Sequence, residues 1–150
     1  MNQALFYQGR RIFNYLADED RYLSGSPQPT LKFGFIGCGI MGQEHIRNTL
    51  LEGRAAIAGL YDPSLRSIEH AQKLVPASQA EGLQIYSSLQ EACNDPQTDA
   101  LIIATPHHTH HEVMRLAASS GKALFLEKPI ATTVADALEI ANLAQQHHLN

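Results

Sequence analysis

Three glycines and an aspartate have the types and spacing of a dinucleotide-binding set. The glycines form the pattern Gly37-x-Gly39-x-x-Gly42, and Asp62 follows twenty positions later. In such a pattern the first glycine permits a sharp turn, the second leaves room for a pyrophosphate, and the third lets a helix pack closely on a sheet. A carboxylate at the position of Asp62 accepts hydrogen bonds from a ribose. The pattern favours a dinucleotide site over an ordinary strand-to-helix turn, which needs glycine only for its backbone freedom.

Histidines and a lysine form a second group of chemically active side chains. Lys128 lies in Glu127-Lys128-Pro129, and histidines occupy positions 107, 108, 110 and 111. His107 and His111 could share a helical face, as paired metal ligands do. Because only Glu112 stands near them at a familiar ligand spacing, we expect no metal site. By residue type alone, Lys128 could equally be a surface cation.

Alternating apolar strands and amphipathic helices must position these residues. Strands are predicted over 32–36, 56–61, 83–86, 100–104 and 123–126, with a helical pattern after each of them. This alternation predicts the α/β class, a doubly wound parallel sheet (Rossmann) with five strands and right-handed crossovers. Three helices begin with capping-box patterns, at Ser88-x-x-Glu91, Thr109-x-x-Glu112 and Thr133-x-x-Asp136.

The unusual residues all fall in loops that follow predicted strands. In a parallel sheet these loops lie at the carboxyl ends of the strands, where ligands bind at the switch point of the strand order. The four loops span residues 37–42, 62–64, 105–110 and 127–129. Their coincidence at one edge predicts a single site.

Residues 1–29 are expected to be an N-terminal arm and linker outside the main domain. Patchy helical spacing up to about residue 23 is followed by the Ser/Pro-rich stretch 24–30, which cannot continue a helix. The arm is either a surface helix on its own domain or a contact to a partner subunit. Residues 30–150 are the expected dinucleotide-binding domain.

Composition excludes several classes of partner. The chain has 150 residues, 17% of them charged, with a net charge of −4, which argues against nucleic acid as a ligand. No apolar run is long enough to span a membrane, and residues 1–20 lack the apolar core of a secretory signal. The two cysteines, Cys38 and Cys93, fall in a loop and a helix and suggest no disulfide framework, and we expect Cys38 to pack rather than react. A reducing cytoplasm fits best.

Four segments together resemble one enzyme family. GCGIMGQEH at 37–45, YDPS at 61–64, DALIIATPHHTH at 99–110 and GKALFLEKPIA at 121–131 are similar to the Gfo/Idh/MocA oxidoreductases, in the same order and spacing. The resemblance covers about residues 31–148. It implies the nucleotide-binding half of an NAD(P)-dependent dehydrogenase or reductase that transfers hydride to or from a sugar, a polyol or a related compound.

The resemblance also implies which residues bind the cofactor. Asp62 would hold the adenosine ribose and repel a 2′-phosphate, which favours NAD, while Arg66 one turn later keeps NADP open. The pyrophosphate would be held by Gly37, Gly39 and Gly42 with the amides of Ile40 and Met41, and the nicotinamide end would be lined by Thr105, Pro106, His107, His110, Glu127 and Lys128.

The catalytic residues implied by the resemblance are Lys128 and His110. Lys128 would hydrogen-bond the reacting hydroxyl, and Glu127 would orient it or contact the nicotinamide ribose. His107 departs from the asparagine that the family often has there. The family's sixth strand and C-terminal substrate domain are absent from these 150 residues. Two alternatives therefore stay open, a stand-alone nucleotide-binding module without turnover and, more weakly, a histidine-rich metal-binding protein. An unpaired sheet edge also leaves homo-oligomers open.

Overall fold

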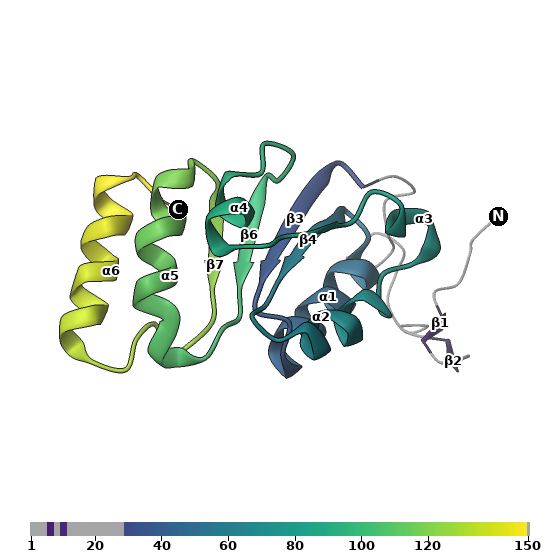
Figure 1. Cartoon of the computed structure of the whole chain (residues 1–150), viewed down its shortest axis with the longest axis horizontal. Coiled ribbons are helices and arrows are strands. Elements are labelled where there is room, and N and C mark those ends of the chain that lie inside the picture. The colour runs from purple at the N-terminus through teal and green to yellow at the C-terminus, as the bar shows by residue number, and fades with distance from the viewer. Residues whose placement is uncertain (1–5, 8–9, 12–28, 150) are drawn as a thin grey trace.

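A five-stranded parallel sheet forms the centre of the computed structural model, which describes residues 6–7, 10–11 and 29–149 (Figure 1). The strand order is β5-β4-β3-β6-β7, so the chain runs outward from β3 on one side and then returns to its other side. The expected doubly wound α/β fold is confirmed. The strands are β3 (Leu31–Ile36), β4 (Ala55–Tyr61), β5 (Gln84–Ile85), β6 (Ala100–Ile103) and β7 (Ala123–Leu126).

Helices cover both faces of this sheet (Figure 1). On one face lie α1 (Ile40–Glu52) and α2 (Leu65–Gln72), and on the other lie α4 (Leu89–Asn94), α5 (His110–Ala117) and α6 (Val134–Gln146). The short helix α3 (Ala77–Ala80) precedes β5, and the 3₁₀ turns η2 (His107–Thr109) and η3 (Ala118–Ser120) flank α5. A parallel sheet needs this cover because both of its faces are apolar.

The central strand β3 shows why the sequence folds in two layers around it. Phe35 and Ile36 are neighbours in sequence, so their side chains point to opposite faces. Phe35 packs with Ile46 of α1, whereas Ile36 packs with Val113 of α5, and neither Phe35 nor Ile36 is exposed to solvent. The consecutive apolar residues at the end of β3 are thus explained by burial on both sides.

A polar network closes the edge of the sheet at which the strands begin, which we call the amino edge. The Lys122 ammonium donates to the carbonyl oxygens of Asp95 at 2.6 Å and Thr98 at 2.8 Å. The Tyr86 hydroxyl donates to Asp95 Oδ2 at 2.6 Å. Burial alone would raise the pKa of Asp95, but hydrogen bonds from Tyr86, the Gln97 amide and Thr98, together with the charge of Lys122, hold it below its ordinary value.

Two of the three capping-box patterns give the N-cap bond that they predict, and one does not. Ser88 Oγ accepts from the Glu91 amide at 3.1 Å, and Thr133 Oγ1 accepts from the Asp136 amide at 3.1 Å. Thr109 does not cap α5, because its hydroxyl lies 2.7 Å from the carbonyl oxygen of Pro106. That carbonyl belongs to the preceding 3₁₀ turn, so the hydroxyl bonds backward and not to the helix it was expected to start.

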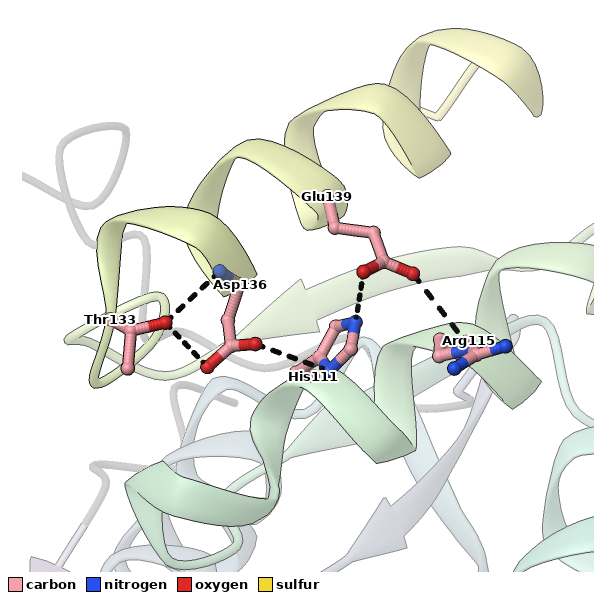
Figure 2. A network of polar contacts seen from close by, with 5 residues as sticks. All are labelled: His111, Arg115, Thr133, Asp136 and Glu139. Atoms are coloured by element: carbon pink, nitrogen blue, oxygen red, sulfur yellow. Dashed lines mark hydrogen bonds and ion pairs between the residues drawn. The ribbon is translucent and has the colours of Figure 1, made fainter.

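A charged network joins α5 to α6 (Figure 2). His111 lies between two carboxylates of α6, with Nδ1 3.5 Å from Asp136 Oδ1 and Nε2 3.0 Å from Glu139 Oε2. Arg115 Nε is 3.9 Å from Glu139 Oε1, and the Thr133 hydroxyl donates to Asp136 Oδ2 at 2.7 Å. His111 is therefore accounted for by helix packing.

Three further details differ from the sequence predictions or qualify them. The strand expected over 83–86 spans only Gln84–Ile85, and α3 was not expected. Within the arm, β1 (Phe6–Tyr7) and β2 (Arg10–Arg11) pair antiparallel, where helical spacing had been expected. The rest of the arm and most of the linker lie outside the described residues. Over the described ranges, no helix has the length and apolar character that a bilayer crossing requires.

Candidate functional site

The glycine loop after β3 is shaped by close backbone contacts. Gly37 has φ +96°, and a Cβ there would lie 2.5 Å from the carbonyl oxygen of Ala104, at the end of the neighbouring β6. A Cβ on Gly42 would lie 2.0 Å from the Gly37 carbonyl oxygen. A Cβ on Gly39, by contrast, would meet nothing within 4 Å. Two of the glycines thus let the loop fold, and the third leaves open space in front of it.

The first turn of α1 presents unpaired donors to that space. The first intrahelical bond runs from the Gln43 amide to the Gly39 carbonyl at 2.9 Å, so the amides of residues 40–42 have no acceptor within the helix. Gly39 supplies no side-chain cap, and no acidic residue lies in the first turn. This helix end therefore combines exposed N–H groups with the positive end of the helix dipole, which suits an anionic group.

Asp62 is joined to the glycine loop by a direct hydrogen bond. Its Oδ2 accepts from the Cys38 amide at 2.8 Å, and its Oδ1 accepts from the Ser64 amide at 2.8 Å. Each oxygen keeps a further lone pair for a ligand. The structure thus brings the predicted ribose-binding carboxylate to the glycine loop. Arg66, one turn later, is exposed.

Cys38 packs rather than reacts, as expected. Its side chain is fully buried, with Sγ 3.6 Å from the Tyr61 carbonyl oxygen. Burial, and then the nearby Asp62 charge, raises the pKa of the Cys38 thiol to about 12. The thiolate, which is the reactive form, is therefore absent near neutral pH.

The loop after β6 and the segment after β7 meet at His110. His110 is fully buried, with Nδ1 2.9 Å from the Pro129 carbonyl oxygen and Nε2 3.1 Å from the Thr105 carbonyl oxygen. Both ring nitrogens face the backbone. The expected catalytic role does not fit this position, because a fully buried ring whose two nitrogens face backbone carbonyl oxygens cannot touch a substrate. His107 is exposed, and its ring lies edge-on to that of His110 at 5.7 Å.

Glu127 and Lys128 follow β7 at the same edge. Lys128 is exposed, and its ammonium makes no hydrogen bond or ion pair with the part of the chain that the structure describes. Glu127 Oε2 accepts from the Lys128 amide at 2.9 Å, and Glu127 Oε1 lies 2.7 Å from His45 Nε2. The hydrogen bond from His45 holds the pKa of Glu127 below its ordinary value, so Glu127 is an anion near neutral pH.

His45 is a site residue to which sequence reasoning assigned no role. It lies one helical turn after Gly42 within the segment 37–45, but its partner Glu127 is 82 residues away. The only signal in the sequence was its position three residues after Gly42, and that spacing does not indicate which residue His45 contacts. The metal alternative gains no support, since no three His, Cys, Asp or Glu side chains among the described residues are placed to hold an ion.

Comparisons with known proteins agree on the family. A model of the Gfo/Idh/MocA family, described as an oxidoreductase family with an NAD-binding Rossmann fold, matches residues 31–150. Inositol 2-dehydrogenase of Paracoccus denitrificans is 35% identical over 113 residues, which cover 74% of this chain and 32% of that protein. Inositol 2-dehydrogenase 2 of Saccharopolyspora erythraea is 32% identical over 104 residues, which cover 69% and 30%.

A solved structure adds a similarity in three dimensions. The myo-inositol dehydrogenase of Lactobacillus casei, crystallised with NAD(H) and myo-inositol, matches with a TM-score of 0.69 at 27% identity and covers 77% of this chain and 33% of that one. The chain thus spans about a third of the length of the relatives it matches.

Proposed function

This chain belongs to the Gfo/Idh/MocA family of oxidoreductases with an NAD-binding Rossmann fold, and on that premise we propose that it supplies the cofactor site of a polyol or sugar dehydrogenase. One observation carries the proposal. The uncapped first turn of α1, the open space at Gly39 and the Asp62 carboxylate lie together at the switch point of the sheet.

The pyrophosphate is assigned to the first turn of α1. The amides of Ile40 and Met41 are free of intrahelical acceptors, and the open space at Gly39 admits phosphate oxygens close to the backbone. No acidic residue lies in this turn, so no carboxylate of the turn itself offsets the positive end of the helix dipole. A Cβ at position 39 would occupy the space that the phosphate needs.

The adenosine ribose is assigned to Asp62. Its two oxygens are held in place by the Cys38 and Ser64 amides, and their remaining lone pairs can accept from the two ribose hydroxyls. A 2′-phosphate at the same place would meet a carboxylate, so we expect NAD to be preferred to NADP. Arg66 is exposed, and no hydrogen bond or ion pair with a described residue directs it to a phosphate.

The reacting end of the cofactor is assigned to the edge between β6 and β7, where Thr105, Pro106 and Lys128 lie. When bound, the nicotinamide ring supplies the hydride acceptor or donor. The exposed Lys128 ammonium is the catalytic residue, since it can donate a hydrogen bond to the substrate oxygen and stabilise negative charge there. His110 is a positioning residue, because its buried ring fills the space between the Thr105 and Pro129 carbonyl oxygens beside the lysine, and a neutral imidazole donates to one of the two.

The substrate class follows from the relatives. Several are inositol 2-dehydrogenases, and one solved structure holds myo-inositol. We therefore assign a cyclic polyol or a related sugar, oxidised at a secondary hydroxyl group. Incubating the protein with NAD and a panel of polyols, and following NADH absorbance, tests this assignment. A reductase of non-carbohydrate substrates would leave the whole panel unchanged.

The cofactor assignment is tested by a matched pair of glycine variants. Both Gly39 and Gly82 have open space where a Cβ would go, but only Gly39 faces the proposed pyrophosphate. We expect Gly39→Ala to weaken NADH binding at least about tenfold in a fluorescence titration, with Tm nearly unchanged, because steric exclusion of a phosphate loses its charge-assisted hydrogen bonds. Gly82→Ala should leave both quantities unchanged. Equal NADH affinity in the two variants would overturn the assignment.

A further inference from the structure

A single carboxylate connects the helix of the glycine loop to the lysine at the other side of the site. Glu127 Oε1 is 2.7 Å from Nε2 of His45 on α1, and Glu127 Oε2 accepts from the Lys128 amide at 2.9 Å. The His45 and Glu127 side chains are only 22% and 13% exposed. This contact is therefore a largely enclosed bridge between two elements, in contrast to the surface ion pairs that contribute little.

The chemistry of the two groups fixes the direction of the bond. An ionised carboxylate only accepts, so His45 donates through Nε2–H. The imidazole is held on its other side by Phe125 of β7, whose ring lies edge to face at a centroid distance of 5.1 Å. Strand β7 thus supplies both the surface on which the ring rests and, two residues later, the carboxylate that it binds. Such packing limits the ring to one orientation.

We propose that His45 is a positioning residue for Lys128, acting through the Glu127 carboxylate. His45 holds Glu127 in the orientation in which its second oxygen binds the Lys128 amide, and this bond fixes the backbone from which the lysine ammonium projects. Because His45 lies one turn after Gly42, the helix that presents its amides to the pyrophosphate also sets the lysine. The inference rests on the proposed function for its purpose, but the physical bridge can be tested separately.

The test is hydrogen exchange at the Lys128 amide, measured by NMR on the whole chain. His45→Leu removes the donor and keeps an apolar contact to Phe125, so we expect Glu127 to be released and the Lys128 amide to exchange about tenfold faster, as loss of a charge-assisted hydrogen bond implies. His45→Gln keeps an N–H donor and should restore most of the protection. His70→Leu, at an exposed histidine of α2, is the matched control and should change nothing.

A pH titration separates positioning from general loosening of the fold. The His45 bond is the main cause of the lowered pKa of Glu127, so His45→Leu should shift the titration of the Glu127 carboxyl resonance to higher pH. Amides of β6 should keep their exchange rates in every variant. If the Lys128 amide and the Glu127 titration are both unchanged in His45→Leu, the bridge has no positioning role and the inference fails.

Failure of the inference and failure of the proposed function give different results. If wild-type protein does not bind NADH, the proposed function fails whatever the Lys128 exchange rate shows. If wild-type protein binds NADH but His45→Leu leaves the Lys128 amide unchanged, only the positioning role is lost. If exchange rises equally across the β6 amides, His45 has a general structural role, and this also overturns the inference.

Discussion

Two lysines at opposite ends of β7 have opposite surroundings. Lys122 lies just before the strand, and its ammonium is bonded to the carbonyl oxygens of Asp95 and Thr98 at the amino edge. Lys128 lies just after the strand, is exposed, and has no side-chain partner within the described residues. Residue type alone does not distinguish them. What distinguishes them is whether the fold already satisfies the charge.

The same contrast holds for the two edges of the sheet as a whole. At the amino edge, Tyr86, Asp95, Thr98 and Lys122 satisfy one another, so this polar network stabilises the fold. At the carboxyl edge, the α1 amides and the Lys128 ammonium keep donors for which the described residues supply no acceptor. Unsatisfied groups with fixed positions are what a ligand site requires. Both edges are polar, but only the carboxyl edge keeps hydrogen-bonding groups without a partner among the described residues, and this difference separates a ligand site from a structural network.

The largest expected effect is on the glycine loop, where a substitution should weaken both the stability of the fold and the binding of the cofactor. Gly37→Ala places a Cβ within 2.5–2.8 Å of the backbone of Ala104 and Thr105, at a positive φ that L-residues rarely adopt. We expect a loss of about 3 kcal/mol in the free energy of unfolding, together with weak NADH binding. Urea denaturation of this variant and of Gly82→Ala measures the difference. A loss within the error of the Gly82→Ala value would show that the loop is not fixed by backbone contact.

The second effect tests the two lysines directly. Lys122→Met removes the side-chain donor to the Thr98 carbonyl oxygen and one of the two donors to the Asp95 carbonyl oxygen, which keeps the Thr98 amide. We therefore expect a loss of about 2 kcal/mol in the free energy of unfolding and unchanged NADH affinity. Lys128→Met should change the free energy of unfolding by less than about 0.5 kcal/mol, as exposed substitutions commonly do. Urea denaturation and NADH titration of both variants give the answer. Equal destabilisation would erase the distinction between the edges.

The third effect concerns the phenol of the amino-edge network and its pH dependence. Tyr86→Phe removes the donor to Asp95 and should cost about 1 kcal/mol at pH 6. The pKa of Asp95 in the folded protein lies below its unfolded value of about 3.9. The ionised Asp95 carboxylate therefore contributes its full share of the free energy of unfolding above the unfolded pKa, and this share is lost as the pH falls through the folded pKa.

The same variant also loses part of what lowers the Asp95 pKa. The difference in stability between wild type and Tyr86→Phe should therefore shrink between about pH 5 and pH 2, below the ordinary carboxyl pKa. Denaturant unfolding of both proteins over this range measures it, and the other carboxyl groups cancel in the difference. A difference that does not vary with pH would show that Tyr86 does not act on the Asp95 carboxylate.

The smallest effect compares two threonines that look alike in sequence. Thr133 caps α6, so Thr133→Ala should cost about 1 kcal/mol. Thr109 does not cap α5, and Thr109→Ala should cost less than half of this, because its hydroxyl bonds the Thr105 hydroxyl and the Pro106 carbonyl oxygen of the preceding loop and not an amide of the helix. Thermal unfolding of the two variants ranks them. The reverse order would mean that the hydroxyl of Thr109 holds the loop at the carboxyl edge more firmly than a cap holds α6.

Local sequence predicts the elements well and their long-range partners poorly. The buried strands β3 and β6 were predictable because burial on both faces requires an unbroken apolar run, and Gly37 was predictable because few residues tolerate its backbone. The cap at Thr133 was predictable, but Thr109 was not, because a proline turn gave its hydroxyl a nearer acceptor. The His45–Glu127 pair could not be predicted, since it depends on how α1 lies against β7, and the burial of His110 depends on two separate loops.

The hydrogen bond between Asp62 and the Cys38 amide limits how the cofactor preference of this domain could be changed to NADP. The usual exchange of an acidic ribose-binding residue for a small neutral one would remove the repulsion of the extra phosphate. Here it would also remove the hydrogen bond that joins position 62 to the loop to which we assign the coenzyme's pyrophosphate. A redesign would have to keep an acceptor at position 62, such as the amide oxygen of asparagine, and recruit the new charge from Arg66. The proposed preference for NAD and the proposed binding of the pyrophosphate both depend on the Asp62 side chain, so neither can be altered alone.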